Sequence, residues 1–346
     1  MDQNFESIEF ENNFDTLYAI ALKRLKITVK YQKFADDRDL DAVADYLHQF
    51  GLTLVSIYRF RLYQALSTEV YWLGSLFQSH GWGMDLLATI LDSWIVAIEG
   101  IVKMPEATHL SAELRKVRKN LDQLSANGSV ASLPTPSQVV TELSDLLLRG
   151  EYNKSRSLIL REIKSGLDVA KIITQLILPA MRFIGSRWQK DDILVYQEHL
   201  ATQTALRLLY LLPEHQKESR QSPYSALISC MPGEDHTLVI IALDTFLKLH
   251  GWKTFPMGTS LAENQVMEAI ESLQPRVYFL SLMMLARLGE AFQLLETIQK
   301  RFPELVIFAG GGGTVHAKAL FAKKNVSVID DFGKIDELAA EKISNA

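Results

Sequence analysis

The stretch SCMPGEDHTLVIIALDTFLKLHGW, residues 229–252, decides the fold class of the chain. It starts with the end of an apolar run typical of a buried strand, turns through a Pro-Gly pair and continues as an amphipathic helix. Glu234, Asp235 and His236 stand side by side in the connecting loop. Two interpretations are open: carboxylates that cap the start of a helix, or a histidine metal ligand with a carboxylate partner.

The same order of strand and helix repeats to the end of the chain. Apolar runs predict strands at 225–231, 253–258, 277–283, 306–311 and 326–330, with helices that begin near His236, Ala262, Arg287, Thr314 and Lys334. Near-continuous apolar strands separated by helices are typical of a parallel sheet covered on both faces. We therefore expect an α/β domain over residues 224–346, with a five-stranded parallel sheet of the flavodoxin-like or Rossmann-like kind.

Polar or flexible residues follow three of these predicted strands. His236 follows the first strand, Ser281 ends the third, and a run of four glycines starts at Gly310 after the fourth. In such folds, ligands bind outside the carboxyl ends of the strands, where the strand order reverses. Three candidate features at one edge of one sheet therefore predict a ligand site there.

The chemistry of His236 suits a metal ligand. A neutral imidazole can ligate a metal through one nitrogen and donate a hydrogen bond from the other. Glu234 is placed to accept that bond, which would fix the tautomer and raise the basicity of the ring. Ser281 could extend this relay. The spacing alone is equally consistent with carboxylates that cap the helix and a solvated histidine.

The stretch AGGGGTVH, residues 309–316, removes side chains where the fourth strand meets its helix. Glycines let a flat or extended ligand approach the backbone, and a helix amino end attracts phosphate. The stretch does not match a dinucleotide fingerprint, which belongs after the first strand. A tight turn needs one or two glycines, so four in a row favour a ligand surface.

Two helical regions precede the α/β domain. Apolar residues at three- and four-residue steps predict helices over 136–150, 151–166, 167–189 and 192–212, with Gly150 and Gly166 at left-handed helix ends. Their short connections are typical of an antiparallel four-helix bundle, which we expect over residues 137–213. Residues 1–130 are expected to form a helical domain, helical from about residue 40, and the Ser- and Pro-rich segment 125–138 to be a linker.

The composition is that of a globular protein, with 48% hydrophobic and 22% charged residues in 346. The net charge of -5 argues against direct DNA binding. Cys230 is the one cysteine, which excludes an intramolecular disulfide and suggests a reducing cytoplasm. The acidic amino-terminal stretch lacks the order of a signal peptide. Because Asp92 and Glu99 interrupt an apolar stretch that is also short, we expect core helices and no membrane association.

The three features at the sheet edge resemble the cobalamin-binding domain shared by methionine synthase and corrinoid proteins. That family carries Asp-x-His-x-x-Gly, Ser-x-Leu and Gly-Gly at these places. The resemblance implies that His236 is the lower cobalt ligand, with Glu234 in place of the aspartate and Ser281 completing the relay. The dimethylbenzimidazole tail of the cofactor leaves cobalt in that family and slides into the sheet, where Gly310 and Gly311 would flank it.

The same resemblance implies further cofactor contacts from the three loops. These are Asp235, Thr237, Met283, Gly312 and Thr314. The chain departs from the family's pattern at Glu234, which keeps the charge of aspartate on a longer arm. It departs again at Val239, which stands where the family has glycine and leaves the depth and fit of the tail open.

The stretch WQKDDILVYQEHLAT, residues 188–202, resembles B12-dependent photoreceptors of the light-responsive repressor type. Those proteins hold a Trp and, ten residues on, a Glu-His pair over the upper face of the corrin. The resemblance implies that Trp188 lies over the upper axial group and that Glu198 accepts hydrogen bonds from the ribose of an adenosyl ligand. It also implies that His199 can reach the metal, including after light has broken the cobalt–carbon bond. It covers about residues 137–335. Where these photoreceptors often have a second histidine, this chain has Gln189.

Without the resemblance, these three residues have a simpler interpretation. Trp188 would be a core residue at the end of the bundle, and Glu198 with His199 would form a polar surface patch. The α/β domain beside them favours the functional interpretation.

Residues 1–130 do not resemble the MerR-type DNA-binding domain of those repressors. Trp72, Trp82 and Trp94 predict an aromatic helical core there, with an effector-docking surface or a second chromophore pocket as the alternative. His80 and His109 are candidates for contact with a second tetrapyrrole, although each is also consistent with a surface histidine.

Together, these patterns predict a cobalamin-binding light sensor rather than an enzyme. Adenosylcobalamin is the expected cofactor, with methylcobalamin as the alternative, and photolysis would change domain or oligomer contacts. We expect the signal to pass to a protein effector or regulator, and the chain to form a homo-oligomer. The alternatives are a corrinoid methyl-carrier protein of a methyltransferase system and a light-independent sensor of cobalamin level.

Overall fold

The computed structural model describes residues 5–32, 37–79, 81–121, 135–190, 192–216, 221–258 and 261–344. The chain forms two compact units. The first contains residues 1–132 with 189–192, and the second contains residues 133–188 with 193–346. The second unit therefore holds both the bundle and the α/β region. The three domain boundaries expected from the sequence stay a prediction, and residues 125–134 of the expected linker lie outside the described residues.

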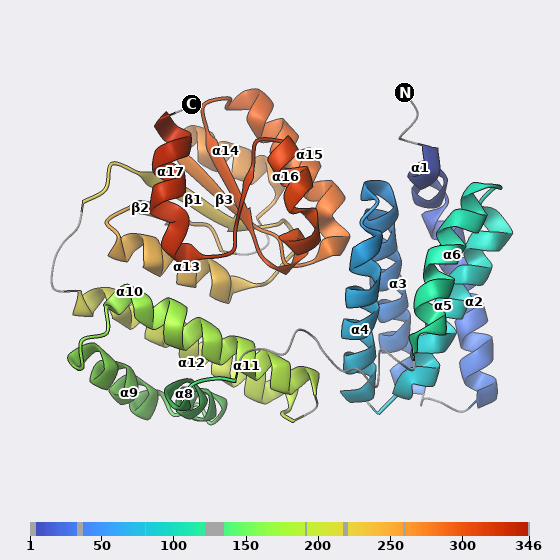
Figure 1. Cartoon of the computed structure of the whole chain (residues 1–346), viewed down its shortest axis with the longest axis horizontal. Coiled ribbons are helices and arrows are strands. Elements are labelled where there is room, and N and C mark those ends of the chain that lie inside the picture. The colour runs from blue at the N-terminus through green and yellow to red at the C-terminus, as the bar shows by residue number, and fades with distance from the viewer. Residues whose placement is uncertain are drawn as a thin grey trace. The chain divides into compact units, whose positions relative to one another are not determined.

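The second unit contains a five-stranded sheet in which all strands are parallel (Figure 1). The strands are β1 (Ser225–Cys230), β2 (Lys253–Pro256), β3 (Val277–Ser281), β4 (Val306–Gly310) and β5 (Ser327–Ile329). Their order is β2-β1-β3-β4-β5, so the direction of winding reverses between β1 and β3. The predicted fold class is confirmed. Ligand sites of such sheets lie at the carboxyl ends of the strands beside this reversal.

Helices connect the strands and cover the sheet. They are α13 (Thr237–Leu249), α14 (Glu263–Leu273), α15 (Leu288–Arg301), α16 (Lys318–Lys323) and α17 (Ile335–Ser344). Helix α13 is apolar nearly all round, and nine of its thirteen residues are buried. Such a helix must be covered on more than one side. It packs against β1 and β2, and also against the helical bundle.

The bundle consists of α8 (Gln138–Leu148), α9 (Tyr152–Lys164), the run α10 (Val169–Ile172) to α11 (Leu178–Gln189), and α12 (Val195–Leu211). Ser137 caps α8. Gly150 and Gly166 have positive φ after α8 and α9, as the sequence predicted. A π-helical turn, Ile173–Ile177, joins α10 to α11 just before Pro179. Proline lacks an N–H, and a π turn is a common way to accommodate the missing bond.

One helical stretch of the described residues, Val169–Gln189, has the length and the hydropathy of a membrane span. Its apolar side forms part of the bundle core, with Ile172, Ile177 and Ile184 fully buried. A core helix passes the same test of length and composition, and the burial of these residues accounts for part of the apolar sequence.

The bundle packs onto the sheet through α12 and α13 (Figure 1). The 3₁₀ turn Leu212–His215, which continues α12, also contacts α13, and Gln216 Nε2 donates to the carbonyl of Leu249 at 2.7 Å. The carboxyl ends of the two helices therefore lie together, and their amino ends point the same way. Helix α10 contacts the same turn, so the run from α10 to α11 starts at this end and finishes at the other. The bundle and the sheet share one continuous hydrophobic core.

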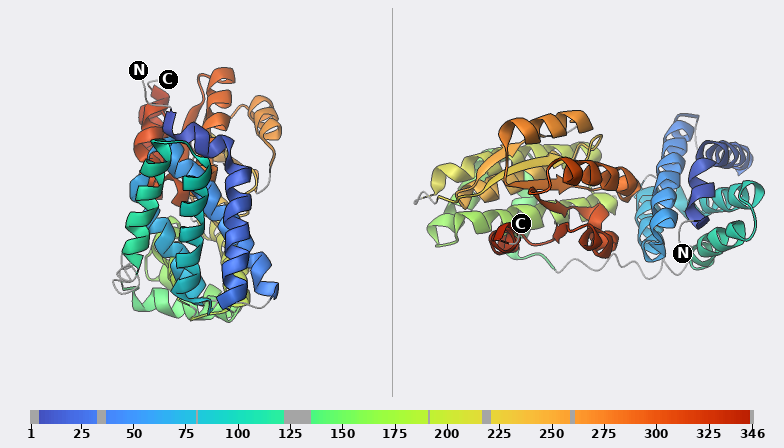
Figure 2. Two further views of the ribbon diagram at one scale, coloured as in Figure 1. Left: turned by 90° about the vertical axis from the view of Figure 1, so that its right-hand side faces the viewer. Right: turned by 90° about the horizontal axis from the view of Figure 1, so that it is seen from above.

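The first unit is helical throughout its described residues (Figure 2). It contains α1 (Phe5–Asn12), α2 (Phe14–Gln32), α3 (Asp37–Phe60), α4 (Tyr63–Ser79), α5 (Gly83–Ile101) and α6 (Glu106–Lys119). Helices α1 and α2 precede residue 40, in a part of the expected helical domain where the sequence analysis assigned no individual helix. Helix α2 packs along α5.

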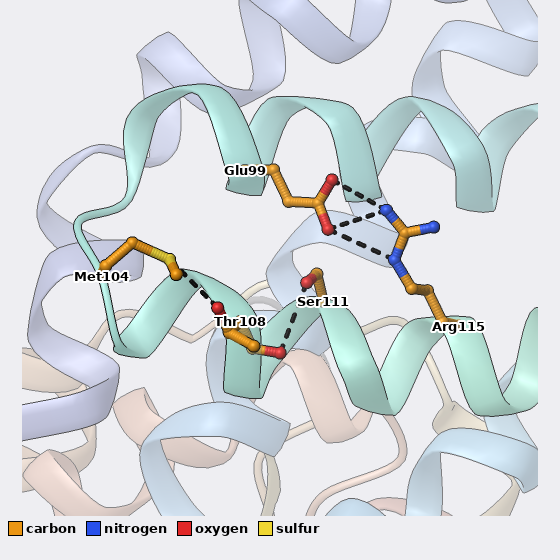
Figure 3. Close-up of polar contacts among 5 residues, drawn as sticks. All are labelled: Glu99, Met104, Thr108, Ser111 and Arg115. Carbon is orange, nitrogen blue, oxygen red and sulfur yellow. Dashed lines mark hydrogen bonds and ion pairs between the residues drawn. The ribbon is translucent and has the colours of Figure 1, made fainter.

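Polar contacts hold α5 and α6 together (Figure 3). Arg115 donates from Nη2 to both carboxylate oxygens of Glu99 at 2.8 Å. This hydrogen bonding lowers the pKa of Glu99. At the turn between the helices, the hydroxyl of Thr108 donates to Met104 Sδ at 3.0 Å.

The predicted aromatic core of this unit is confirmed for two of its three tryptophans. Trp94 is fully buried and Trp82 is buried, whereas Trp72 is exposed. Phe14 stacks on Trp94, and a Cβ on Gly51 would lie 2.3 Å from the Trp94 ring. His109 is exposed and lies 3.2 Å from the Tyr63 hydroxyl. His80 lies outside the described residues. The second tetrapyrrole stays a prediction.

Candidate functional site

The candidate site starts from a row of residues at the carboxyl ends of three neighbouring strands. Cys230 of β1 pairs with Ser281 of β3, which pairs with Gly310 of β4. The strand register therefore brings together Ser281 and Gly310, which are far apart in the sequence. The loop that carries His236 leaves the sheet directly beside this row.

Glu234 binds the loop on the other side of the strand reversal. Its side chain is fully buried. The N–H of Met283 donates to Oε2 at 2.8 Å, and the N–H of Met284 donates to Oε1 at 2.9 Å. The carboxylate thus links the loop after β1 to the loop after β3. The sequence analysis missed this role, because the partners are backbone amides, which any residue type provides.

His236 precedes the first residue of α13 and lies close to the buried carboxylate. Its Nδ1 is 3.7 Å from Glu234 Oε2, an ion-pair distance rather than a hydrogen-bond distance. Its side chain is 47% exposed, and its carbonyl accepts a contact from the Cys230 thiol at 3.6 Å. With Nδ1 on the side of the carboxylate, Nε2 would be the nitrogen available to a metal. The two side chains are neighbours, but the hydrogen bond expected between them is not formed at this distance.

Ser281 is buried, and its hydroxyl has no hydrogen-bond partner among the described residues. It makes no relay contact with Glu234 in the structure. Instead it lines a cavity of about 50 Å³ between the sheet and α13, together with Gly310, Gly311 and Val239. An unpartnered buried hydroxyl is costly. This hydroxyl is therefore a candidate to bind a ligand or a water molecule in the cavity.

The glycine run has a structural reason that sequence reasoning did not identify. Gly311 has φ +100, and a Cβ there would lie 2.4 Å from the carbonyl oxygen of Leu282. A Cβ on Gly313 would lie 3.0 Å from the Leu282 side chain, and one on Gly310 would lie 3.2 Å from the carbonyl of Ile329. The glycines therefore let the loop after β4 pack against its neighbours. Gly310 and Gly311 also line the cavity, so both explanations apply to them.

The remaining predicted residues lie around this edge. The Thr314 hydroxyl is buried and donates to the carbonyl of Gly311 at 2.8 Å. A Cβ on Gly312 would lie 3.3 Å from the carbonyl of Met283. Asp235 is exposed, and its carbonyl accepts from the N–H of Thr237, the first residue of α13. The residues predicted to contact the lower face of the cofactor, here called the lower set, thus lie in three adjacent loops after β1, β3 and β4.

Burial also affects the thiol in this row. Burial of Cys230, reinforced by the negative charge of Glu234, raises the pKa of the thiol to about 11. The residue therefore stays a protonated, unreactive thiol at neutral pH.

Trp188, Glu198 and His199, the residues predicted to contact the upper face and here called the upper set, belong to helices α11 and α12 of the bundle. Trp188, near the end of α11, is half-buried against the core. His199 Nδ1 lies 3.0 Å from Glu198 Oε2 and 3.1 Å from the carbonyl of Val195. Because Nδ1 faces two acceptors, Nε2 is the nitrogen for a metal, and the side chain is 73% exposed. Glu198 also accepts from the Thr202 hydroxyl at 2.8 Å.

The two sets lie at the same end of the second unit. The carboxyl ends of α12 and α13 lie together, and the helices point the same way. His199 is 12 residues before Leu211 (211 − 199), and Thr237 is 12 residues before Leu249 (249 − 237). At 1.5 Å per residue, both positions lie about 18 Å from the shared end. Trp188 belongs to the same end, because α10 starts at the opposite one.

Two protein-family models match the second unit. Residues 139–212 match a protein-family model described as B12 binding domain, and residues 224–341 match a second model with the same description. The second unit therefore contains B12-binding domains.

Two curated relatives are HTH-type transcriptional repressors of Myxococcus xanthus. CarH is 26% identical over 192 residues, which cover 54% of this chain and 63% of CarH. CarA is 26% identical over 166 residues, which cover 47% of this chain and 55% of CarA. The chain spans less than two thirds of the length of either relative. Among solved structures, the Methanosarcina barkeri monomethylamine corrinoid protein has a TM-score of 0.49 and 15% identity, covering 60% of this chain and 99% of that one.

The residues of the candidate site suit a metal ion whose other ligands come from a macrocycle. Within the described ranges, no group of three or more His, Cys, Asp or Glu could hold a bare metal ion. A corrin supplies four ring nitrogens, so the protein needs to add only one axial ligand, and His236 beside a buried carboxylate suits that role. The cavity behind it fits less well. An apolar cavity of about 150 Å³ is the size that takes up benzene, and this cavity has about 50 Å³.

Proposed function

We propose that this protein binds adenosylcobalamin and acts as a light sensor that signals through protein contacts. His236 would hold the cobalt from the loop after β1, while Trp188, Glu198 and His199 would contact the adenosyl side. When bound, this cofactor supplies a cobalt–carbon bond that light breaks. His199 is the candidate second cobalt ligand in the light.

One observation supports the proposal most strongly. Two histidines with Nδ1 near a carboxylate, His199 and His236, lie at the same end of two packed helices that point the same way. The exposed apolar residues Leu194, Val195, Tyr196 and Leu200 surround the upper pair. An apolar surface around a metal-ligating imidazole suits a large, flat cofactor. The similarity to the repressors CarH and CarA supports a role in regulation.

The proposed signal would pass through the hydrophobic core that the bundle and the sheet share. Because α12 packs directly on α13, a change at the exposed end of the bundle can shift these two helices and alter a contact with another copy or another protein. We propose binding and signalling in the cytoplasm, through a homo-oligomer and a protein effector, without direct DNA contact and without catalysis.

Reconstitution with adenosylcobalamin in the dark tests the proposal. We expect the visible spectrum and the native mass both to change after green light. His236→Ala should lose the spectral signature of histidine ligation. His250→Ala is the matched control, because His250 lies at the other end of α13 and its Nδ1 bonds the Phe246 carbonyl. A holoprotein whose spectrum and mass stay constant in light contradicts the proposal.

Two further measurements separate the alternatives. Methyl transfer to the bound cobalt from a folate or thiol donor would instead identify a corrinoid methyl carrier. Equal responses to hydroxocobalamin and adenosylcobalamin in darkness would identify a sensor of cobalamin level.

A further inference from the structure

Of the α13 residues that line the cavity, Val239 is the nearest in the sequence to the candidate cobalt ligand. It lies on the first turn of α13, three residues after His236, and its side chain lines the cavity between this helix and the sheet. The opposite wall is formed by the ends of β3 and β4, with the Ser281 hydroxyl among them. A group that enters the cavity from the carboxyl edge of the sheet therefore meets Val239 on the helix side.

The deeper walls of the cavity are formed by packed aromatic and aliphatic side chains. Phe279 stacks on Phe308, with ring centroids 5.2 Å apart, and Phe332 packs on Phe246 at 5.5 Å. Leu243 closes the helix side. Interiors packed in this way resist deformation, and added volume costs about 1–3 kcal/mol.

The volume of the cavity decides what it can hold. A water molecule needs at least about 10–15 Å³ of this volume, and benzene is bound in apolar cavities of about 150 Å³. At about 50 Å³, this cavity accommodates a few water molecules, one of which can bond Ser281. A dimethylbenzimidazole base is larger than benzene and does not fit beside Val239.

We infer that Val239 keeps the nucleotide tail of the corrinoid outside the sheet, so that this site recognises the corrin ring and its axial histidine but not the base. The inference rests on the proposed function. It implies that cobinamide, which has the ring but carries no nucleotide base for His236 to displace from cobalt, binds more tightly than cobalamin.

Paired titrations of the apo full-length chain with aquacobalamin and diaquacobinamide test this. Calorimetry measures the affinity, and absorbance reports histidine ligation. We expect the natural chain to bind diaquacobinamide at least about threefold more tightly than aquacobalamin, because His236 displaces water from the one and the nucleotide base from the other. Val239→Gly, which removes the whole side chain from the cavity wall, should raise the affinity for cobalamin at least tenfold and leave cobinamide unchanged. Leu238→Gly is the matched control, because Leu238 is adjacent and does not line the cavity.

A larger side chain at position 239 distinguishes binding with the nucleotide tail outside the sheet from binding with the tail inside it. Val239→Ile should leave both affinities unchanged if the tail stays outside. If the natural chain binds cobalamin tenfold or more tightly than cobinamide, and Val239→Ile weakens only cobalamin, the tail enters the sheet and the inference is wrong. An unchanged cobalamin affinity in Val239→Gly would also overturn it. If neither corrinoid binds, the proposed function itself fails.

Discussion

Replacing Glu234 with glutamine tests whether this carboxylate fixes the edge of the sheet. In the structure, Oε2 accepts from Met283 N–H at 2.8 Å and Oε1 accepts from Met284 N–H at 2.9 Å. Glutamine keeps one oxygen and turns an NH₂ group toward the other amide. One charge-assisted hydrogen bond is lost, which costs about 1.5–3 kcal/mol. The buried position prevents water from replacing it easily.

Hydrogen exchange measured at these two amides gives the local cost directly. A loss of about 1.5–3 kcal/mol corresponds to roughly 10- to 150-fold faster exchange. If the loop opens only with its unit, the melting temperature of that unit should fall by roughly 3–12 °C.

Glu290→Gln is the matched control for this experiment. Its carboxylate is 58% exposed and pairs with Arg287, so we expect a change within about 0.5 kcal/mol. Exchange at the Met283 and Met284 amides that rises less than threefold in Glu234→Gln would refute the assigned role of this carboxylate.

Two further predictions concern the same edge. Gly311→Ala should destabilise the second unit by about 3 kcal/mol or more, because alanine tolerates φ +100 poorly and its Cβ would lie 2.4 Å from the Leu282 carbonyl oxygen; thermal denaturation measures this. Gly185→Ala, in a helix with no atom within 4 Å of the added Cβ, should instead stabilise the unit by about 0.5–1 kcal/mol. The pKa of Cys230 is raised from 9.0 to about 11 in the fold, so the folded chain binds this proton more tightly than the unfolded chain. This difference contributes up to about 2–3 kcal/mol to the free energy of unfolding. The contribution is complete below about pH 9 and is lost as the pH rises to about 11. Cys230→Ala should flatten that part of the stability curve in urea titrations, and identical slopes for both proteins would contradict the assignment.

The sequence predicts the sheet well because of how parallel strands are buried. Strands covered on both faces are near-continuous apolar runs, and each of the five predicted strands matches an observed one to within two residues at either end. Helices α1 and α2 were not predicted. Charged residues, such as Lys23, Arg24 and Lys26 in α2, dilute the apolar periodicity there, and packing against α5 and α3 compensates for it.

The candidate site was predictable from the sequence only in part. The loop residues that follow the strands can be predicted to lie together, because parallel strands end at one edge of the sheet. The partners of Glu234 are not, since backbone amides have no sequence signature. The glycine run was interpreted as a ligand surface, whereas Gly311 and Gly313 are also required by neighbouring backbone and side-chain atoms within the fold. Only the three-dimensional register shows which neighbour a missing Cβ makes room for.

Glu234 couples the position of His236 to the loop after β3. A carboxylate that oriented only the imidazole could move with it. This one is fixed by two amides from another loop, so Nδ1 of His236 faces a charge whose position the sheet determines. The longer arm of glutamate lets the carboxylate span the strand reversal to those amides and still approach the ring at 3.7 Å. Displacement of the Met283–Met284 backbone therefore changes the electrostatic environment of the imidazole, and a change in the charge of His236 acts back on that backbone.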